Sequence, residues 1–171
     1  MTGRAPPPDP HATSDVFTPE KRSQVMARVR QRNTAPELTL RRMLHAAGYR
    51  YRLHAKALPG SPDLAFASRK VALFVHGCFW HGHDCPRGAR APKANAAYWS
   101  AKIERNRARD AAAETALAGQ GWRAVTVWEC ELRDPALPGR LAEALGPPGA
   151  QATAASAASG SRPAQAASTA R

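Results

Sequence analysis

The chain has few acidic residues for its length, and this shortage sets its net charge. Among 171 residues, 13 are Asp or Glu and 25 are Lys or Arg, so the formal charge is +12 and the isoelectric point is near 10.8. An excess of this size favours an anionic partner, with nucleic acid the first candidate and an anionic membrane surface the second. Most of the excess is arginine, which binds phosphate through two hydrogen bonds. A GC-rich coding bias, which also enriches alanine, proline and glycine, is the alternative explanation.

Long apolar stretches are absent too. No run approaches the ~20 residues of a membrane span, and the opening "MTGRAPPPDPHATSD" lacks the apolar segment of a secretory signal. Only 3 cysteines occur, and two of them lie in one His-rich stretch. An odd number of cysteines in that setting favours a reduced, cytoplasmic chain with a metal site over a disulfide framework.

Composition divides the chain into three regions. Residues 1–17 are Pro-rich and polar, which predicts a disordered N-terminal extension. Residues 147–171 are a low-complexity sequence of Ala, Ser, Gly and Pro, which predicts a disordered tail. Residues 18–146 remain as the folded part, and their number suits a single domain.

Apolar spacing within 18–146 predicts a mixed α/β domain. A cap signal at Thr18 and the capping-box spacing of Thr34 and Glu37 predict two helices. Three strands follow, at "YRYRL" and in a hairpin of "DLAFA" with "KVALFVH", which is apolar enough for burial on both faces. A long helix over about 95–117, a buried strand at "WRAVTVWEC" and a short helix at "GRLAEAL" come next. This order predicts an α/β fold with a central mixed β-sheet flanked by helices.

The stretch "HGCFWHGHDC", from His76 to Cys85, concentrates metal-ligating residues. It contains Cys78, His83 and Cys85, and Cys130 directly follows a second predicted apolar strand. Because Cys78 also follows such a strand, parallel pairing of the two strands would place these cysteines side by side. Three thiolates and one imidazole make the closed set typical of structural zinc. Three buried free cysteines are the alternative.

A catalytic zinc would instead keep one position open to water. Nucleobase deaminases, which use such a zinc, carry His-x-Glu and Pro-Cys-x-x-Cys motifs. Neither motif occurs in this sequence. We therefore expect a structural zinc, which leaves His76 and His81 for other chemistry.

Polar residues at strand ends indicate a second site. Asp63 opens a predicted buried strand and His76 closes the next one. A carboxylate is a hard ligand suited to magnesium, and His76 and His81 titrate near neutral pH and can move protons. Asp110 lies on the mainly apolar face of the long helix and needs a partner, either in this site or in a buried salt bridge to an arginine. For Glu37, the capping box is already a sufficient explanation.

Several segments together resemble one family. They are "LPGSPDLAF", "LFVHGCFWHGHDC", "YWSAKIERN" and "GWRAVTVWEC", in that order, after the opening "RSQVMARVRQRNTAPE". The chain resembles the very short patch repair endonucleases, the Vsr family, over about residues 20–145, and the His- and Cys-rich cluster is highly specific to that family. The resemblance implies a restriction-endonuclease-like α/β core with a structural zinc site. The residues that match the zinc ligands are Cys78, His83, Cys85 and Cys130.

The resemblance also implies a catalytic site for Mg²⁺. Asp63 matches the carboxylate ligand of the magnesium, and Val75 stands where the family usually has a threonine that contributes its backbone carbonyl. This carbonyl survives the change, so metal binding should survive as well. His76 and His81 match the active-site histidines, with His81 the expected base for the attacking water. The residues that match acids holding metal-bound waters or orienting a histidine are Glu37 and Asp110.

Aromatic residues acquire a role through the same resemblance. Family members insert aromatic wedges beside a T:G mismatch, and the matching residues are Phe79, Trp80 and Trp99, with Met26 entering from the other groove. A mispaired step should open more easily than a paired one, so the wedges help to select the mismatch. Trp99 has an alternative as a core residue of the long helix. Trp122 and Trp128 share one face of a strand, and we expect them to pack.

The implied function is a magnesium-dependent endonuclease that nicks double-stranded DNA 5′ to the thymine of a T:G mismatch. This mismatch arises when 5-methylcytosine deaminates, so a companion cytosine methyltransferase and other mismatch-repair proteins are the further partners that the resemblance suggests. A less mismatch-selective or restriction-type nuclease of the same fold, and a zinc-stabilised DNA-binding protein without catalysis, are the alternatives. We expect a cytoplasmic, nucleoid-associated bacterial protein without membrane contact. We also expect a monomer, because the lesion is asymmetric.

Overall fold

A computed structural model describes residues 21, 24, 32–90 and 95–149 of the chain. Most of the helix expected from Thr18, the residue Met26, the N-terminal extension 1–17 and residues 150–171 of the predicted tail lie outside this range. Among the described residues, none of the helices is long and apolar enough to cross a bilayer.

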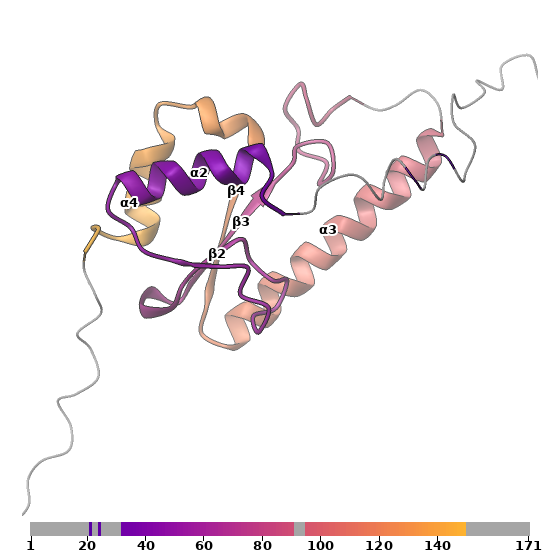
Figure 1. Cartoon of the computed structure of the whole chain (residues 1–171). Helices are drawn as coiled ribbons and strands as arrows, with labels where there is room; N and C mark the ends of the chain where they lie inside the picture. Colours follow the sequence, from indigo (N-terminus) through magenta and orange to yellow (C-terminus); the bar gives the residue numbers. More distant parts are fainter. Residues whose placement is uncertain (1–20, 22–23, 25–31, 91–94, 150–171) are drawn as a thin grey trace, which may run out of the picture.

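Seven helices and strands follow one another in the described part of the chain (Figure 1). Their order is helix, three strands, helix, strand and helix, as the sequence predicts. Short 3₁₀ turns, η1 (Ala67–Arg69) and η2 (Glu129–Arg133), follow β2 and β4. The bounds are α2 (Ala35–Ala46), β1 (Arg52–Leu53), β2 (Leu64–Phe66), β3 (Val71–His76), α3 (Ala96–Gly119), β4 (Arg123–Trp128) and α4 (Leu137–Leu145).

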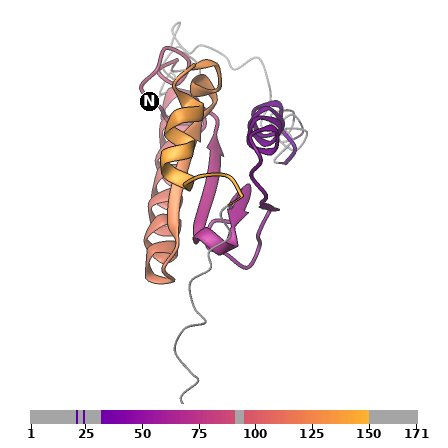
Figure 2. The same ribbon diagram turned by 90° about the vertical axis from the view of Figure 1, so that its left-hand side faces the viewer.

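The strands form one mixed sheet in the order β1-β2-β3-β4. β1, β2 and β3 pair antiparallel, which confirms the predicted hairpin, and β3 pairs with β4 in parallel. The parallel pair needs a crossover, and α3 supplies it. Figure 2 shows the strands between α2 on one side and α3 on the other. This arrangement confirms the predicted class, a restriction-endonuclease-like α/β core.

Side chains alternate between the two faces of the sheet. On one face, large aliphatic residues of β2, β3 and β4 pack against α2 and α4. On the other face Ala65 and Ala72 are small and buried, which leaves room for α3. His76 and Trp128 belong to this second face, so the alternation directs them toward α3. The core on the first face consists of Leu40, Leu44, Tyr49, Leu64, Phe66, Val71, Leu73, Val127, Leu137, Leu141 and Leu145.

The structure corrects two predicted strands. Only Arg52 and Leu53 of "YRYRL" pair as a strand, because the amide of Tyr49 donates to the carbonyl of Leu44 at the end of α2. The alternation itself holds, since Tyr49 and Tyr51 pack on Phe66. Strand β4 is also not buried on both faces. It is the edge strand of the described sheet, and of its residues only Val127 is buried.

Candidate functional site

The candidate site lies where β3 and β4 end. Parallel strands end at the same edge of a sheet, and the register pairs His76 with Trp128 as the last residues of the two strands. The segment after β3 folds back tightly, with the amides of His81 and His83 donating to the carbonyls of Gly77 and Cys78 at 3.2 and 2.9 Å. The two strand ends and this loop therefore gather residues that are far apart in the sequence.

The four predicted zinc ligands lie together at this edge. One ligand atom from each of them lies within 4.8 Å of the others. Strand pairing brings Cys130 to the loop, as predicted, with its Sγ 3.5 Å from His83 Nδ1. The ring of Trp128 stacks on His83 at 4.3 Å and covers one side of the cluster. The four residues are Cys78, His83, Cys85 and Cys130.

The chemistry of this cluster fits a soft dication. Burial and the neighbouring thiols of Cys78 and Cys85 raise the pKa of Cys130 to about 12. A hydrogen bond with His83 lowers the pKa of Cys85 to about 6. Thiols this close cannot all ionise unless a cation is present, and a zinc ion deprotonates the thiols that coordinate it. The loop requires a glycine at residue 88, because a Cβ on Gly88 would lie 2.0 Å from the carbonyl oxygen of His83.

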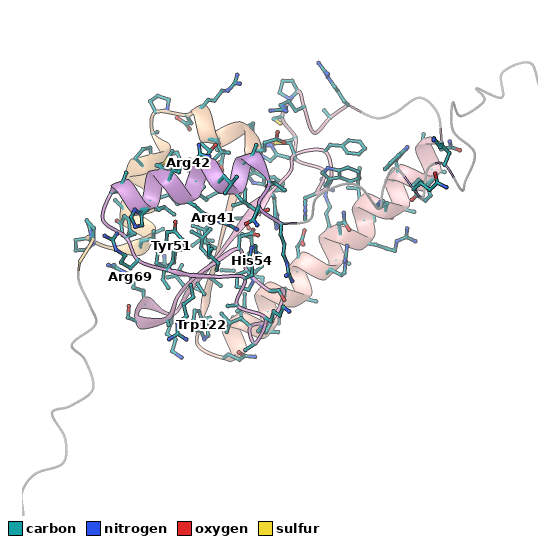
Figure 3. All side chains as sticks on the ribbon, viewed as in Figure 1. Arg41, Arg42, Tyr51, His54, Arg69 and Trp122 are labelled. Atoms are coloured by element: carbon teal, nitrogen blue, oxygen red, sulfur yellow. The ribbon has the colours of Figure 1, made fainter. Side chains whose placement is uncertain are left out.

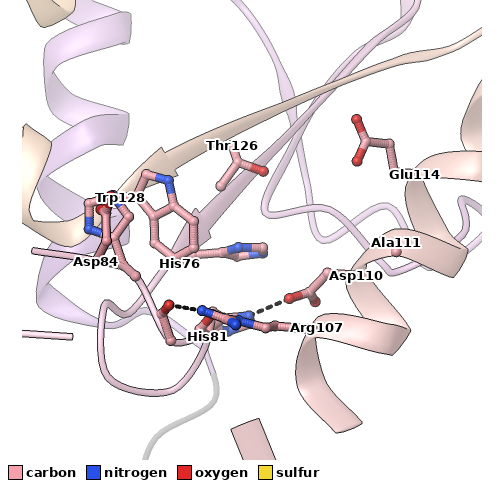
Figure 4. A pocket seen from close by; sticks show the side chains of 11 residues that line it. His76, His81, Asp84, Arg107, Asp110, Ala111, Glu114, Thr126 and Trp128 are labelled. Carbon is pink, nitrogen blue, oxygen red and sulfur yellow. Dashed lines mark hydrogen bonds and ion pairs between the residues drawn. The ribbon is translucent and has the colours of Figure 1, made fainter. Parts of the chain in front are cut away.

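His76, His81 and Asp110 form a second cluster (Figure 4). The two imidazole rings stack with centroids 3.8 Å apart and planes 9° from parallel. His81 Nδ1 lies 2.6 Å from Asp110 Oδ2 on α3, so the partner of this carboxylate is a histidine rather than the arginine of the alternative. Burial, together with the nearby His81, lowers the pKa of His76 to about 4. His76 is therefore neutral at physiological pH.

Asp63 shares a pocket with this histidine pair. The pocket is lined by Asp63, Val75, His76, His81 and Asp110, among others. The amide of Val75 donates to Asp63 Oδ2 at 2.8 Å, which fixes the carboxylate beside the end of β3. Burial raises the pKa of Asp63, and the hydrogen bond from Val75 opposes that shift. A partly desolvated carboxylate in an otherwise accessible pocket fits a hard dication such as Mg²⁺.

A glycine turn brings Asp63 to the pocket. Gly60 has a φ of +72°, and a Cβ at this position would lie 2.8 Å from the Cβ of Ala113 on α3. Only glycine allows the turn to pass so close to the helix in this conformation. The motif "PGSPD" therefore positions Asp63 through its backbone.

Glu37 lies on the far side of Asp63 and outside the pocket that contains the histidines. Its carboxylate accepts hydrogen bonds from the amide of Asn33, the hydroxyl of Thr34 and the guanidinium of Arg41, all at 2.8–2.9 Å. Thr34 is the N-cap of α2, as predicted, and its Oγ1 is 3.4 Å from the amide of Glu37. The carboxylate caps the helix through Asn33 rather than through the N-cap amide of a standard capping box.

Sequence reasoning did not identify Arg41 and His54. Both lie beside Glu37 and Asp63, and a ring nitrogen of His54 lies within 4.8 Å of both carboxylates. One signal for Arg41 was available, since it follows Leu40 and precedes Leu44 on the buried side of α2 and stands four residues after Glu37. His54 offered none, because it follows an exposed two-residue strand.

Three predicted wedge residues form one aromatic cluster next to the histidine loop. The ring centroids of Phe79, Trp80 and Trp99 are 5.1–6.0 Å apart, and each side chain is partly exposed. Lys102 Nζ lies 5.2 Å from the Trp80 centroid. Trp99 lies on the predicted face of α3, in the first turn of the helix, where its side chain is partly exposed. Trp128 packs against the histidines, as expected.

The mixed sheet with a carboxylate and a histidine pair at its strand ends defines a restriction-endonuclease-like protein. The family model described as DNA mismatch endonuclease Vsr matches residues 14–87. The chain belongs to the Vsr family, an endonuclease family, which confirms the resemblance.

Curated relatives support this assignment over most of the chain. Type II nicking enzyme V.XorIIP of Xanthomonas oryzae pv. oryzae is 55% identical over 135 residues, which cover 78% of this chain and 98% of that protein. Type II nicking enzyme V.NmeAIP of Neisseria meningitidis is 42% identical and covers 72% of this chain and 88% of its own length. DNA mismatch endonuclease Vsr of Escherichia coli is 37% identical over 81% of this chain and 92% of its own length.

Proposed function

We propose that this protein nicks double-stranded DNA on the 5′ side of the thymine in a T:G mismatch, leaving 5′-phosphate and 3′-hydroxyl ends. The observation that carries the proposal is the pocket shared by Asp63, His76, His81 and Asp110. A carboxylate for a hard metal ion and a histidine oriented by a second carboxylate are the groups that phosphodiester hydrolysis needs. A protein that only bound DNA would need neither.

His81 is the general base in this proposal. Its Nδ1 is held by Asp110, so Nε2 is the nitrogen that can accept a proton from the attacking water. His76 stacks on the His81 ring and keeps it in place while remaining neutral. Glu37 orders water around the site from its position next to Asp63.

Two metal ions serve different purposes in the proposal. Cys78, His83, Cys85 and Cys130 would hold a structural zinc, which would fix the loop that carries His81. Asp63 and the backbone carbonyl of Val75 would hold Mg²⁺, which would supply positive charge to stabilise the phosphate during hydrolysis.

Recognition of the mismatch is assigned to the aromatic cluster. Phe79, Trp80 and Trp99 lie next to the loop of His81, so a base step opened by these rings would be close to the pocket. Met26, outside the described residues, acts from the other groove. The basic surface, with a net charge of +12, binds phosphates of any sequence and supplies affinity. A companion cytosine methyltransferase, whose methylated sites would generate the T:G lesion by deamination, is part of the same proposal.

A nuclease with less mismatch selectivity is the second candidate. It is favoured by the names of V.XorIIP and V.NmeAIP, which describe nicking enzymes without mention of a mismatch. Duplexes that are identical except for T:G, T:A and C:G at one position, each labelled at the 5′ end of one strand, separate the two. The proposal predicts one product, from the T:G duplex, ending at the nucleotide before the thymine. Equal cleavage of all three duplexes would instead support the second candidate.

A further inference from the structure

A buried arginine lies next to the carboxylates of the proposed magnesium site. Arg41 on α2 is 7% exposed. Its Nη2 lies 2.8 Å from Glu37 Oε2 and 3.2 Å from His54 Nε2, and its Nη1 donates to Asn33 Oδ1 at 2.6 Å. Figure 3 shows Arg41 on the side of α2 where His54 lies, while the neighbouring Arg42 is exposed. Three neighbours therefore hold the guanidinium in place.

The position of Arg41 Nη2 is one that a metal ion could otherwise occupy. One ligand atom each from Glu37, His54 and Asp63 lies within 4.8 Å of the others. Two carboxylates and an imidazole are a suitable donor set for a first-row transition dication such as Mn²⁺. Nuclease sites with two metal ions place them about 3.5–4 Å apart. A second ion beside one on Asp63 would draw its ligands from Glu37 and His54, and Arg41 Nη2 already contacts both of these side chains.

We propose that Arg41 is a built-in cation that fills this second metal position and restricts the protein to a single catalytic metal ion at Asp63. The inference rests on the proposed function, because that function places the magnesium at Asp63. A guanidinium group keeps its positive charge in proteins. The position is therefore filled under all working conditions, and a second dication would meet a fixed positive charge.

The hydrogen bond to His54 also defines the role of one ring nitrogen. A guanidinium can only donate, so His54 Nε2 is the acceptor. With Glu37 and Asp63 ionised, Arg41 reduces the negative charge of the cluster from two to one. Removing the guanidinium would restore the second charge and free a lone pair on His54. Both changes favour a metal ion at that position.

A purely structural role makes a different prediction. Arg41 and Glu37 have the i, i+4 spacing of a helix-stabilising ion pair. If that were the whole function, replacing Arg41 would lower stability and create no metal site. The number of ions bound therefore distinguishes the two roles, and it does so without an activity measurement.

The test counts Mn²⁺ bound by the zinc-loaded full-length protein, from the electron paramagnetic resonance signal of the free ion. We expect one Mn²⁺ per chain for the unchanged protein, two for Arg41→Met, and one for the control Arg42→Met. Adding His54→Ala to Arg41→Met should return the number to one. Arg41→Gln, which also removes the charge, replaces Arg41→Met if the latter does not fold.

The results separate this inference from the proposed function. One ion on both the unchanged protein and the Arg41 variants, or two ions on the unchanged protein, would overturn the inference and leave the magnesium site at Asp63 intact. No ion on the unchanged protein would overturn the magnesium site and the inference together. Asp63→Asn should remove the single ion from the unchanged protein.

Discussion

His81 Nδ1 on the loop after β3 lies 2.6 Å from Asp110 Oδ2 on α3, across 29 residues of sequence. A carboxylate at this distance selects the tautomer that carries the proton on Nδ1 and leaves Nε2 free to accept one. The same pair holds the loop against the helix. The orientation and tautomer of the proposed base therefore depend on one contact with α3.

Asp110→Asn should slow nicking of a T:G duplex by about 10²–10⁴-fold, the usual contribution of a positioned general base. The amide no longer selects the tautomer, while both side chains are partly exposed, so the melting temperature should change little. Single-turnover nicking, duplex binding and thermal melting measure these effects. Glu114→Gln is the matched control, because Glu114 is another acidic residue of α3 that lines the same pocket as Asp110. This variant should nick normally. Normal nicking by Asp110→Asn would contradict the assignment of His81.

Cys130→Ser should reduce zinc content and stability together, because a closed zinc site contributes folding energy directly. Elemental analysis and thermal melting check this in the same sample. Glu129→Gln, the preceding residue, alters only a partly exposed ion pair with Arg87 and should keep its zinc. A well-folded unchanged protein without zinc would show that the cluster is not a zinc site.

Trp80→Ala should lower nicking of T:G far more than it lowers binding to fully paired DNA. Stacking is worth about 1–3 kcal/mol per base by alanine substitution, so the loss should be roughly 5- to 150-fold. A core tryptophan would instead cost about 3–5 kcal/mol of stability. Thermal melting beside nicking rates therefore decides between wedge and core. A large fall in melting temperature would refute the wedge.

Gly60→Ala should lower stability by about 1–3 kcal/mol, since alanine is strained at positive φ and its Cβ would meet Ala113. Nicking should fall as well, because this turn positions Asp63. Gly119→Ala serves as the control. Its Cβ would meet nothing within 4 Å at the end of α3, so stability should hold or rise. Denaturant unfolding measures both, and an unchanged stability for Gly60→Ala would contradict the role of the turn.

Local patterns predict much of this molecule. The apolar run "KVALFV" correctly indicates β3, whose first three residues are buried in succession, as in a strand that is covered on both faces. The three- and four-residue spacing from Trp99 to Leu117 correctly indicates α3, because its less exposed residues follow the helical period. The cysteines that end two such runs meet as expected once β3 and β4 pair in parallel. The length of β1 and the burial of β4 were less predictable, since both depend on which strands lie at the edges of the sheet.

The part of the site behind Asp63 could not be predicted from spacing. Arg41 and His54 are 13 residues apart, on a helix and after an exposed strand, and they meet only when the chain between them turns back along α2. Asp110 illustrates an intermediate case. Its place on an apolar helix face shows that it needs a partner, but only the folded loop after β3 identifies that partner as His81.

Nicking of a T:G duplex by the purified, zinc-loaded protein, with and without Mg²⁺, tests the central claim most directly. The matched T:A duplex and the Asp63→Ala variant complete the experiment. We predict a single nick 5′ to the mispaired thymine that requires Mg²⁺, no nick in the T:A duplex, and an Asp63→Ala protein that still binds the T:G duplex but does not cut it. Full activity of Asp63→Ala, or equal nicking of T:G and T:A, would contradict the account.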